Sequence, residues 1–144
     1  MKNVEIPIEM ELPQHFLKYG SETSFPAHAV VYREKDPIGK TPVFYVAAGL
    51  VKVEYPVRSQ TFSLWVHPDS IFGLVEPLAE CPRLCTVQAM ERTVCYTWDM
   101  EGFFLAAGVS WELAVAAITG LSRELRTLNA EFGERIHALG KASP

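Results

Sequence analysis

Six short runs of β-branched and aromatic residues lie between about Thr23 and Trp98, and turn-forming residues separate them. The runs cover residues 28–34, 42–49, 50–57, 61–67, 85–90 and 93–98. Short strands at this spacing are typical of an antiparallel sandwich or roll. Apolar residues alternate with Lys52 and Glu54 in the third run, so we expect these two charged side chains to face water. The sequence therefore predicts a mainly β domain.

Helical patterns follow the last of these runs. We expect Asp99 to cap a short helix that ends at Gly108, because aspartate favours the start of a helix and glycine favours its end. We expect Ser110 to cap a much longer helix, from Trp111 to about His137. The side chain of Trp111 is expected to pack against the rest of the chain. The sequence thus predicts a β domain that is followed by a short helix and a long one.

The apolar residues of the long helix recur in alternating steps of three and four, which is typical of a two-helix coiled coil. They are Ile118, Leu121, Leu125, Leu128 and Phe132. A helix of this length cannot bury its far end on a small β domain, so we expect these residues to form the interface of a parallel homodimer. The alternative is a helix that packs only on its own domain. The predicted division is a β domain over 1–110, a dimerisation helix over 111–139 and a tail over 140–144.

The segment from Asp69 to Val87 combines a glycine with a single arginine. Phe72 and Gly73 close an apolar run, a short helical turn is predicted next, and Arg83 follows before another apolar run. Glycine lets a ligand approach the backbone closely, and free N–H groups together with one guanidinium attract an anion. The segment therefore predicts a compact anion pocket.

The order of these features resembles the sensor domain of the Crp/Fnr transcription regulators, which is a cyclic-nucleotide-binding domain. Gly49 stands at the turn after the aromatic strand FYVAAGLVKV, where the family has a glycine, whereas Lys35 replaces the glycine of the family's Arg-Glu-Gly-Asp turn. The resemblance covers about residues 20–138. It implies a double-stranded β-helix, or jelly-roll β-roll, with short flanking helices and a long C-terminal dimerisation helix. It also implies a ligand-sensing regulator rather than an enzyme.

The ligand site that the resemblance implies is matched only in part. In relatives that bind cyclic AMP, a glutamate after the Phe-Gly pair holds the ribose, and a Ser or Thr after the arginine helps to hold the phosphate. Leu74 and Leu84 occupy these positions here. An unpaired buried hydroxyl costs on the order of 1–3 kcal/mol, so we expect a small, anionic effector other than cyclic AMP, or none. The predicted ligand contacts are Gly73, Leu74, Glu76 as a substitute acid, Arg83 and Leu84, with Leu128 and Asn129 on the long helix.

Two other interpretations stay open. Cys81-Pro82 resembles the Cys-Pro motif of haem proteins, and some Crp/Fnr relatives sense gases through haem, for which Cys81, His67 or His28 are the candidate ligands. A β-roll also resembles a cupin, whose metal-dependent enzymes place two or three His and a Glu on adjacent strands. His28 and His67 lack that spacing, and no nucleophile motif is visible, so we expect no metal site and no catalytic residue.

The net charge and the N-terminal segment indicate which kinds of binding partner to expect. The formal net charge is −4 and no Lys/Arg cluster is present, whereas a protein that binds duplex DNA normally carries a basic face. We therefore expect contact with DNA only through a helix-turn-helix domain, which these residues do not include. The N-terminal segment reads neither as a signal peptide nor as a membrane span. We expect a cytoplasmic homodimer that binds a small-molecule effector and has no membrane partner.

Overall fold

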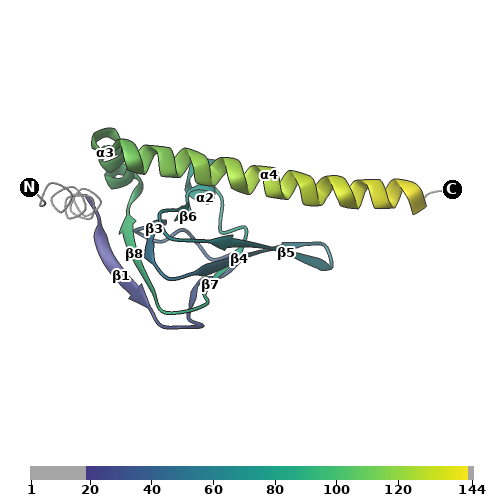
Figure 1. The fold of residues 1–144 in the computed structure, drawn as a ribbon, viewed down its shortest axis with the longest axis horizontal. Helices are drawn as coiled ribbons and strands as arrows, with labels where there is room; N and C mark the ends of the chain where they lie inside the picture. The colour runs from purple at the N-terminus through teal and green to yellow at the C-terminus, as the bar shows by residue number, and fades with distance from the viewer. Residues whose placement is uncertain (1–18, 143–144) are drawn as a thin grey trace, which may run out of the picture.

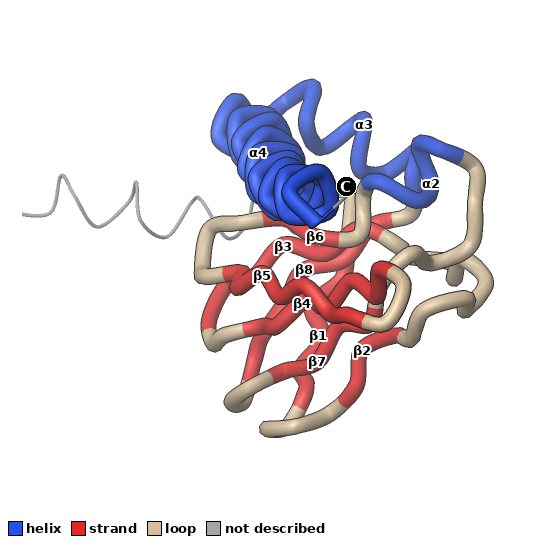
Figure 2. The backbone as a smooth tube through the Cα atoms, turned by 90° about the vertical axis from the view of Figure 1, so that its right-hand side faces the viewer, coloured by secondary structure: helices blue, strands red, loops and turns tan. Residues whose placement is uncertain are grey.

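The computed structural model describes residues 19–142, without the side chains of Leu128 and of residues 131–142. In this part of the chain the strands form two antiparallel four-stranded sheets, with the orders β1-β8-β3-β6 and β2-β7-β4-β5. Figures 1 and 2 show the two sheets folded over one another as a roll, with the helices along one side. The predicted β-roll is confirmed. The strands are β1 (Ser21–Phe25), β2 (Val30–Tyr32), β3 (Val43–Ala48), β4 (Val51–Val57), β5 (Gln60–Val66), β6 (Ile71–Phe72), β7 (Thr86–Ala89) and β8 (Thr93–Trp98).

Strand β4 shows why these residues form a sheet with one buried face. Val51, Val53 and Tyr55 are buried, while Lys52 and Glu54 lie on the other face with Nζ and Oε2 3.7 Å apart. Side chains alternate between the two faces of a strand, so this spacing places these three apolar side chains inside the roll. The predicted alternation is confirmed.

The buried residues form two clusters, one on each side of strands β3 and β8. The first lies between the sheets, and within it the rings of Phe44 and Phe72 stack at a centroid distance of 4.7 Å. The second lies between the roll and the helices, and it is built around Trp98, Phe103 and Leu113. The second cluster holds the helices against the roll, since burial of large apolar side chains is the main favourable term in packing.

In the described part of the chain, three helices lie on this side of the roll, namely α2 (Val75–Ala79), α3 (Met100–Val109) and α4 (Trp111–Ala142). Helices α3 and α4 contribute side chains to the second cluster. The predicted caps are confirmed: the Oδ1 atom of Asp99 accepts from the N–H of Gly102 at 2.6 Å, and the Oγ atom of Ser110 accepts from the N–H of Leu113 at 3.2 Å. Helix α4 lies along the roll and then continues past it, beside the projecting β4–β5 hairpin (Figure 1).

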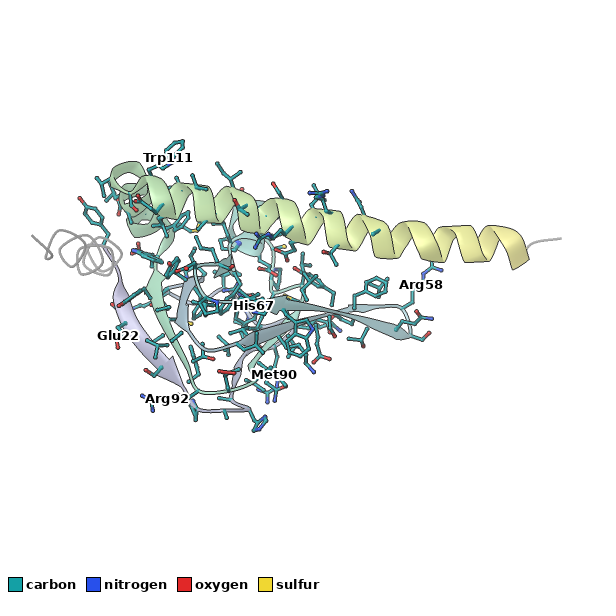
Figure 3. The ribbon with its side chains drawn as sticks, viewed as in Figure 1. Glu22, Arg58, His67, Met90, Arg92 and Trp111 are labelled. Carbon is teal, nitrogen blue, oxygen red and sulfur yellow. The ribbon has the colours of Figure 1, made fainter. Side chains whose placement is uncertain are left out.

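Several predicted boundaries differ from the structure. Strand β1 was not expected as a separate strand. It forms because each of its residues pairs with a residue of Thr93–Thr97 on β8, in antiparallel register. Gly108 does not end α3, which continues to Val109, and α4 ends at Ala142 rather than near residue 137. Trp111 does not pack: its side chain is 77% exposed and points away from the roll (Figure 3).

The turns at Gly49 and Lys35 contain residues with a positive backbone φ angle. Gly49 lies in the β3–β4 turn with a φ of +105°, as the predicted glycine turn requires. Lys35 has a φ of +76° in the turn after β2, a conformation that is costly for a residue with a Cβ atom. This turn docks on the candidate site, because the N–H of Lys35 donates to the carbonyl of Arg83 at 2.7 Å.

Candidate functional site

The glycine of the predicted anion pocket is required by the fold itself. Gly73 links β6 to α2 with a φ of +88°, and a Cβ atom there would collide with the backbone carbonyl of Pro42. The same atom would lie 3.4 Å from Nη1 of Arg83. The close approach that the sequence predicts for a ligand is thus made by the chain's own backbone.

The guanidinium of Arg83 is buried and makes three hydrogen bonds within the chain. Nη1 donates to the carbonyl of Gly73 at 3.0 Å and to Oε1 of Glu76 at 2.9 Å, and Nη2 donates to the carbonyl of Pro42 at 2.9 Å. Its Cζ atom lies 3.8 Å from the ring centroid of Tyr32, a distance typical of a cation–π contact. The Arg83 side chain is 3% exposed. The single arginine of the segment therefore serves an internal network.

Glu76 supplies the negative charge of that network. It lies on α2 and is 2% exposed, and its Oε2 atom accepts from the N–H of Leu84 at 3.2 Å and from the Cys85 thiol at 3.6 Å. Burial, followed by the charge of Glu76, raises the pKa of Cys85 to about 12, so this thiol stays protonated. A carboxylate of the chain thus occupies the place beside Arg83 where an effector anion was expected.

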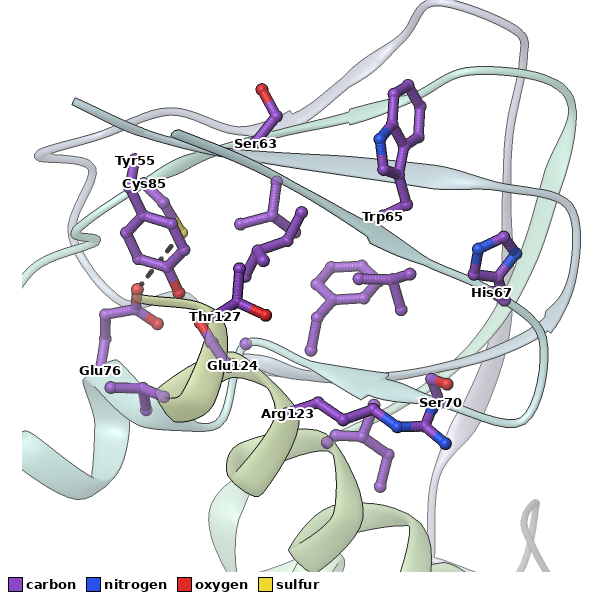
Figure 4. Close-up of a pocket in the computed structure, with 18 of the residues that line it drawn as sticks. Tyr55, Ser63, Trp65, His67, Ser70, Glu76, Cys85, Arg123, Glu124 and Thr127 are labelled. Carbon is purple, nitrogen blue, oxygen red and sulfur yellow. Dashed lines mark hydrogen bonds between the residues drawn. The ribbon is translucent and has the colours of Figure 1, made fainter. Parts of the chain in front are cut away.

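A cavity of about 550 Å³ lies next to this ion pair, between the roll and α4. Residues of β4, β5, β6 and the start of α2 form one wall, and α4 forms the other (Figure 4). The apolar lining includes Val53, Leu64 and Phe72, with Tyr55. The indole of Trp65 lies on the outer face of β5, opposite Lys52, and points away from α4 (Figure 4). The polar lining residues include His67, Ser70 and Glu76 on one wall and Arg123, Glu124, Arg126 and Thr127 on α4.

Only two of the predicted ligand contacts line this cavity, namely Gly73 and Glu76. Leu74 is buried in the cluster beneath the helices, and Leu84 is 47% exposed at the surface. Neither they nor Arg83 are among the lining residues. On α4, Asn129 is exposed and does not line the cavity, and the side chain of Leu128 lies outside the described residues.

The sequence analysis missed the polar groups that α4 contributes. Gly120, Glu124 and Thr127 follow steps of four and three, which places them on one face of the helix. This spacing was available in the sequence, but only the apolar seam of the helix was interpreted. Burial raises the pKa of Glu124 to about 7, because the carboxyl lies in the cavity rather than in water.

The predicted seam of α4 divides between the roll and solvent. Ile118 is 65% exposed and Leu125 is 61% exposed, whereas Leu121 packs partly against the cluster beneath the helices. The side chains of Leu128 and Phe132 lie outside the described residues. Val115, 39% exposed, extends the open apolar stripe towards Trp111. An apolar stripe left open on a helix is typical of a contact surface.

Two further features bear on the class of site. Within residues 19–130, whose side chains the structure largely describes, no three His, Cys, Asp or Glu side chains are grouped so that they would hold a metal ion. No single described helix is long and apolar enough to cross a membrane; α3 and the first part of α4 reach that length only together, and the chain bends by 119° between them.

Comparison with known proteins identifies the class. The family model for the cyclic nucleotide-binding domain matches residues 22–105. This chain belongs to that family, which confirms the resemblance found in the sequence. No curated protein matches the chain.

Solved structures agree on the fold. The heme domain of CooA from Carboxydothermus hydrogenoformans has a TM-score of 0.74 at 18% identity, with 96% of this chain and 97% of that chain covered. The heme domain of CooA from Rhodospirillum rubrum has a TM-score of 0.70 at 17% identity, with 95% and 97% covered. Thermus thermophilus Catabolite Activator Protein has a TM-score of 0.66 at 23% identity, with 88% of this chain and 58% of that chain covered. This chain thus spans little more than half of the Thermus protein.

Proposed function

We propose that this chain is the ligand-sensing domain of a Crp/Fnr-type transcription regulator. The observation that carries the proposal is the cavity between the roll and α4, whose two walls belong to different elements of the chain. A small effector that contacts both walls favours one packing of α4 over another, and its differential affinity for the two packings sets the size of the response.

We expect helix α4 to transmit the effector-dependent change in packing to the rest of the regulator. Ile118 and Leu125 lie on its open side, and the helix continues past the roll. Two such helices in a parallel homodimer would bury these side chains against each other. The proposed partners are a small-molecule effector, a second copy of the chain and a DNA-binding domain that receives the change, in the cytoplasm.

The effector site is tested by blocking the cavity. Thr127 on α4 points into it (Figure 4), so Thr127→Phe should fill the space, and Ala130→Phe adds a ring to the same helix outside the cavity. A thermal-shift screen with cyclic nucleotides, haem and a panel of metabolites should find a compound that raises the melting temperature of the wild type and of Ala130→Phe. An effector at a free concentration of 100 times its dissociation constant adds about 2.7 kcal/mol to the free energy of unfolding. Equal stabilisation of Thr127→Phe would place the binding site elsewhere.

Haem sensing is the second candidate, because the CooA heme domains match nearly the whole chain in fold. Of the three candidate ligands, only the imidazole of His67 lines the cavity, and it is exposed there; Cys81 and His28 do not line it. Haem bound here would supply an iron atom that binds gases, with His67 as its protein ligand. Titration with haemin should then give a Soret band that His67→Ala loses and His28→Ala keeps. The absence of such a band in the wild type rejects this candidate.

A further inference from the structure

One charged group of the cavity, the carboxylate of Glu124, is without a partner among the described residues. The carboxylate of Glu124, which α4 carries into the cavity, makes no hydrogen bond or ion pair with any other described residue. Figure 4 shows it at the same end of the cavity as Glu76, while Arg123, His67 and Ser70 lie at the other end. A carboxylate that is withdrawn from water without a cation is unfavourable, and a positively charged ligand relieves that cost.

The groups around Glu124 do not compensate its charge. From the roll, Tyr32, Glu76, Cys85 and Tyr55 line the cavity with Glu124, and Arg83 lies behind Glu76, outside the lining. Arg83 is the one cation among them, and Glu76 already neutralises it at 2.9 Å. This end of the cavity therefore carries a net negative charge.

The cations on Glu124's own helix lie at the rim. Arg123 and Arg126 are exposed, and neither forms an ion pair with Glu124. His67 is also exposed, at the far end of the cavity. Exposed charges are screened by water and salt, so they contribute little to the potential at the partly buried carboxylate of Glu124.

The rest of the lining suits a flat apolar molecule. Phe72 and Tyr55 are buried on the inner wall, and the ring of Tyr32 also lines the cavity. Aromatic side chains favour stacked or edge contacts with a second ring, and they also attract a cation to their faces. An aromatic body with one positive group matches both parts of this lining.

We propose that the effector of this cavity is an aromatic amine whose protonated nitrogen pairs with Glu124. The inference rests on the proposed function, since it assumes that the cavity is the effector site. It reverses the polarity of a cyclic-nucleotide site: the buried end of the cavity selects for a cation where an anion was expected.

The proposal is tested with three probes that share an indole ring. Tryptamine is a cation at neutral pH, tryptophol is neutral and indole-3-propionate is an anion. Calorimetric titration of the full chain at pH 7 should show tryptamine binding at least tenfold more tightly than tryptophol, and indole-3-propionate binding most weakly. Since the pKa of Glu124 is about 7 without ligand, tryptamine should also release about half a proton at this pH, measured in two buffers of different ionisation enthalpy.

Matched variants assign the preference to one residue. Glu124→Gln keeps the shape of the side chain and removes its charge, so it should bind tryptamine and tryptophol equally and release no proton. Glu91→Gln removes an exposed carboxylate outside the cavity and should behave as the wild type. The proposal is overturned if indole-3-propionate binds most tightly, if Glu124→Gln keeps the preference for the amine, or if none of the three probes binds. In each case an effector found by the Thr127→Phe screen leaves the proposed function standing.

Discussion

Replacing Glu76 with alanine tests whether the Glu76–Arg83 pair is part of the folded core. The variant removes the carboxylate that lies 2.9 Å from Nη1 of Arg83 and leaves a guanidinium whose side chain is 3% exposed. It also leaves the N–H of Leu84 without the Oε2 acceptor. The two carbonyls of Gly73 and Pro42 still accept from the guanidinium, but they carry no charge to neutralise it.

The expected cost follows from this geometry. Removing one partner of a buried ion pair costs about 3–5 kcal/mol, because the other charge is left uncompensated. A domain of this size loses about 3 °C of melting temperature per kcal/mol, so Glu76→Ala should melt about 10 °C below the wild type. The exposed control Glu91→Ala should change stability by less than about 0.5 kcal/mol.

Urea unfolding followed by circular dichroism measures these differences, and a double variant separates charge from packing. Glu76→Met combined with Arg83→Met replaces both charges with apolar side chains, and such replacements of a buried pair are often neutral or stabilising. The double variant should therefore be more stable than Glu76→Ala. The reasoning is refuted if Glu76→Ala costs less than about 1 kcal/mol, or if the double variant is the least stable of the set.

The same variant should change anion binding. In the wild type Glu76 neutralises Arg83, so inorganic phosphate and cyclic AMP are expected to shift the melting temperature very little. Glu76→Ala frees the guanidinium, and phosphate should then stabilise the variant in proportion to its concentration. Equal stabilisation of both proteins by phosphate would show that Arg83 is open to anions in the wild type, as the sequence predicted.

Three further predictions concern other parts of the chain. Lys35→Gly should raise stability by about 1 kcal/mol in urea unfolding, because Lys35 has a φ of +76°; a loss of stability would show that this turn is not strained. Leu125→Asp should convert a dimer into a monomer in light scattering, and a monomeric wild type would contradict the proposed interface. The raised pKa of Glu124 means that the folded chain binds this proton more tightly than the unfolded chain, so stability should fall by up to about 3 kcal/mol between about pH 4.5 and 7. Glu124→Gln should flatten that slope, and an unchanged pH profile would contradict the burial of this carboxyl.

Most of the fold could be predicted because its signals are local. Alternation in β4, the caps at Asp99 and Ser110 and the glycine turn at Gly49 each depend on residues close together in the sequence. The order of these elements then indicated the family. Strand β1 was missed because its polar residues acquire a strand conformation by pairing with β8, which lies far away along the chain.

The candidate site was predicted less well for the same physical reason. The sequence placed Gly73, Glu76 and Arg83 near one another, but it could not show that Glu76 is the partner of Arg83. That pairing depends on how α2 turns its carboxylate inward, and on the backbone of Pro42, which is remote in the sequence. The face of α4 that meets the roll depends likewise on packing against the cluster beneath the helices.

The sequence by itself determined the β-roll, the long helix and the family, because alternation, capping and turn chemistry act between neighbouring residues. The tertiary structure alone decided which charges are used internally and which remain for a ligand. Arg83 is neutralised within the core, whereas Glu124 lines a cavity without a partner among the residues that the structure describes. The free energy of a charge depends on its burial and on its partners in space. Both depend on contacts between residues that are distant in the sequence, so local sequence patterns do not reveal them.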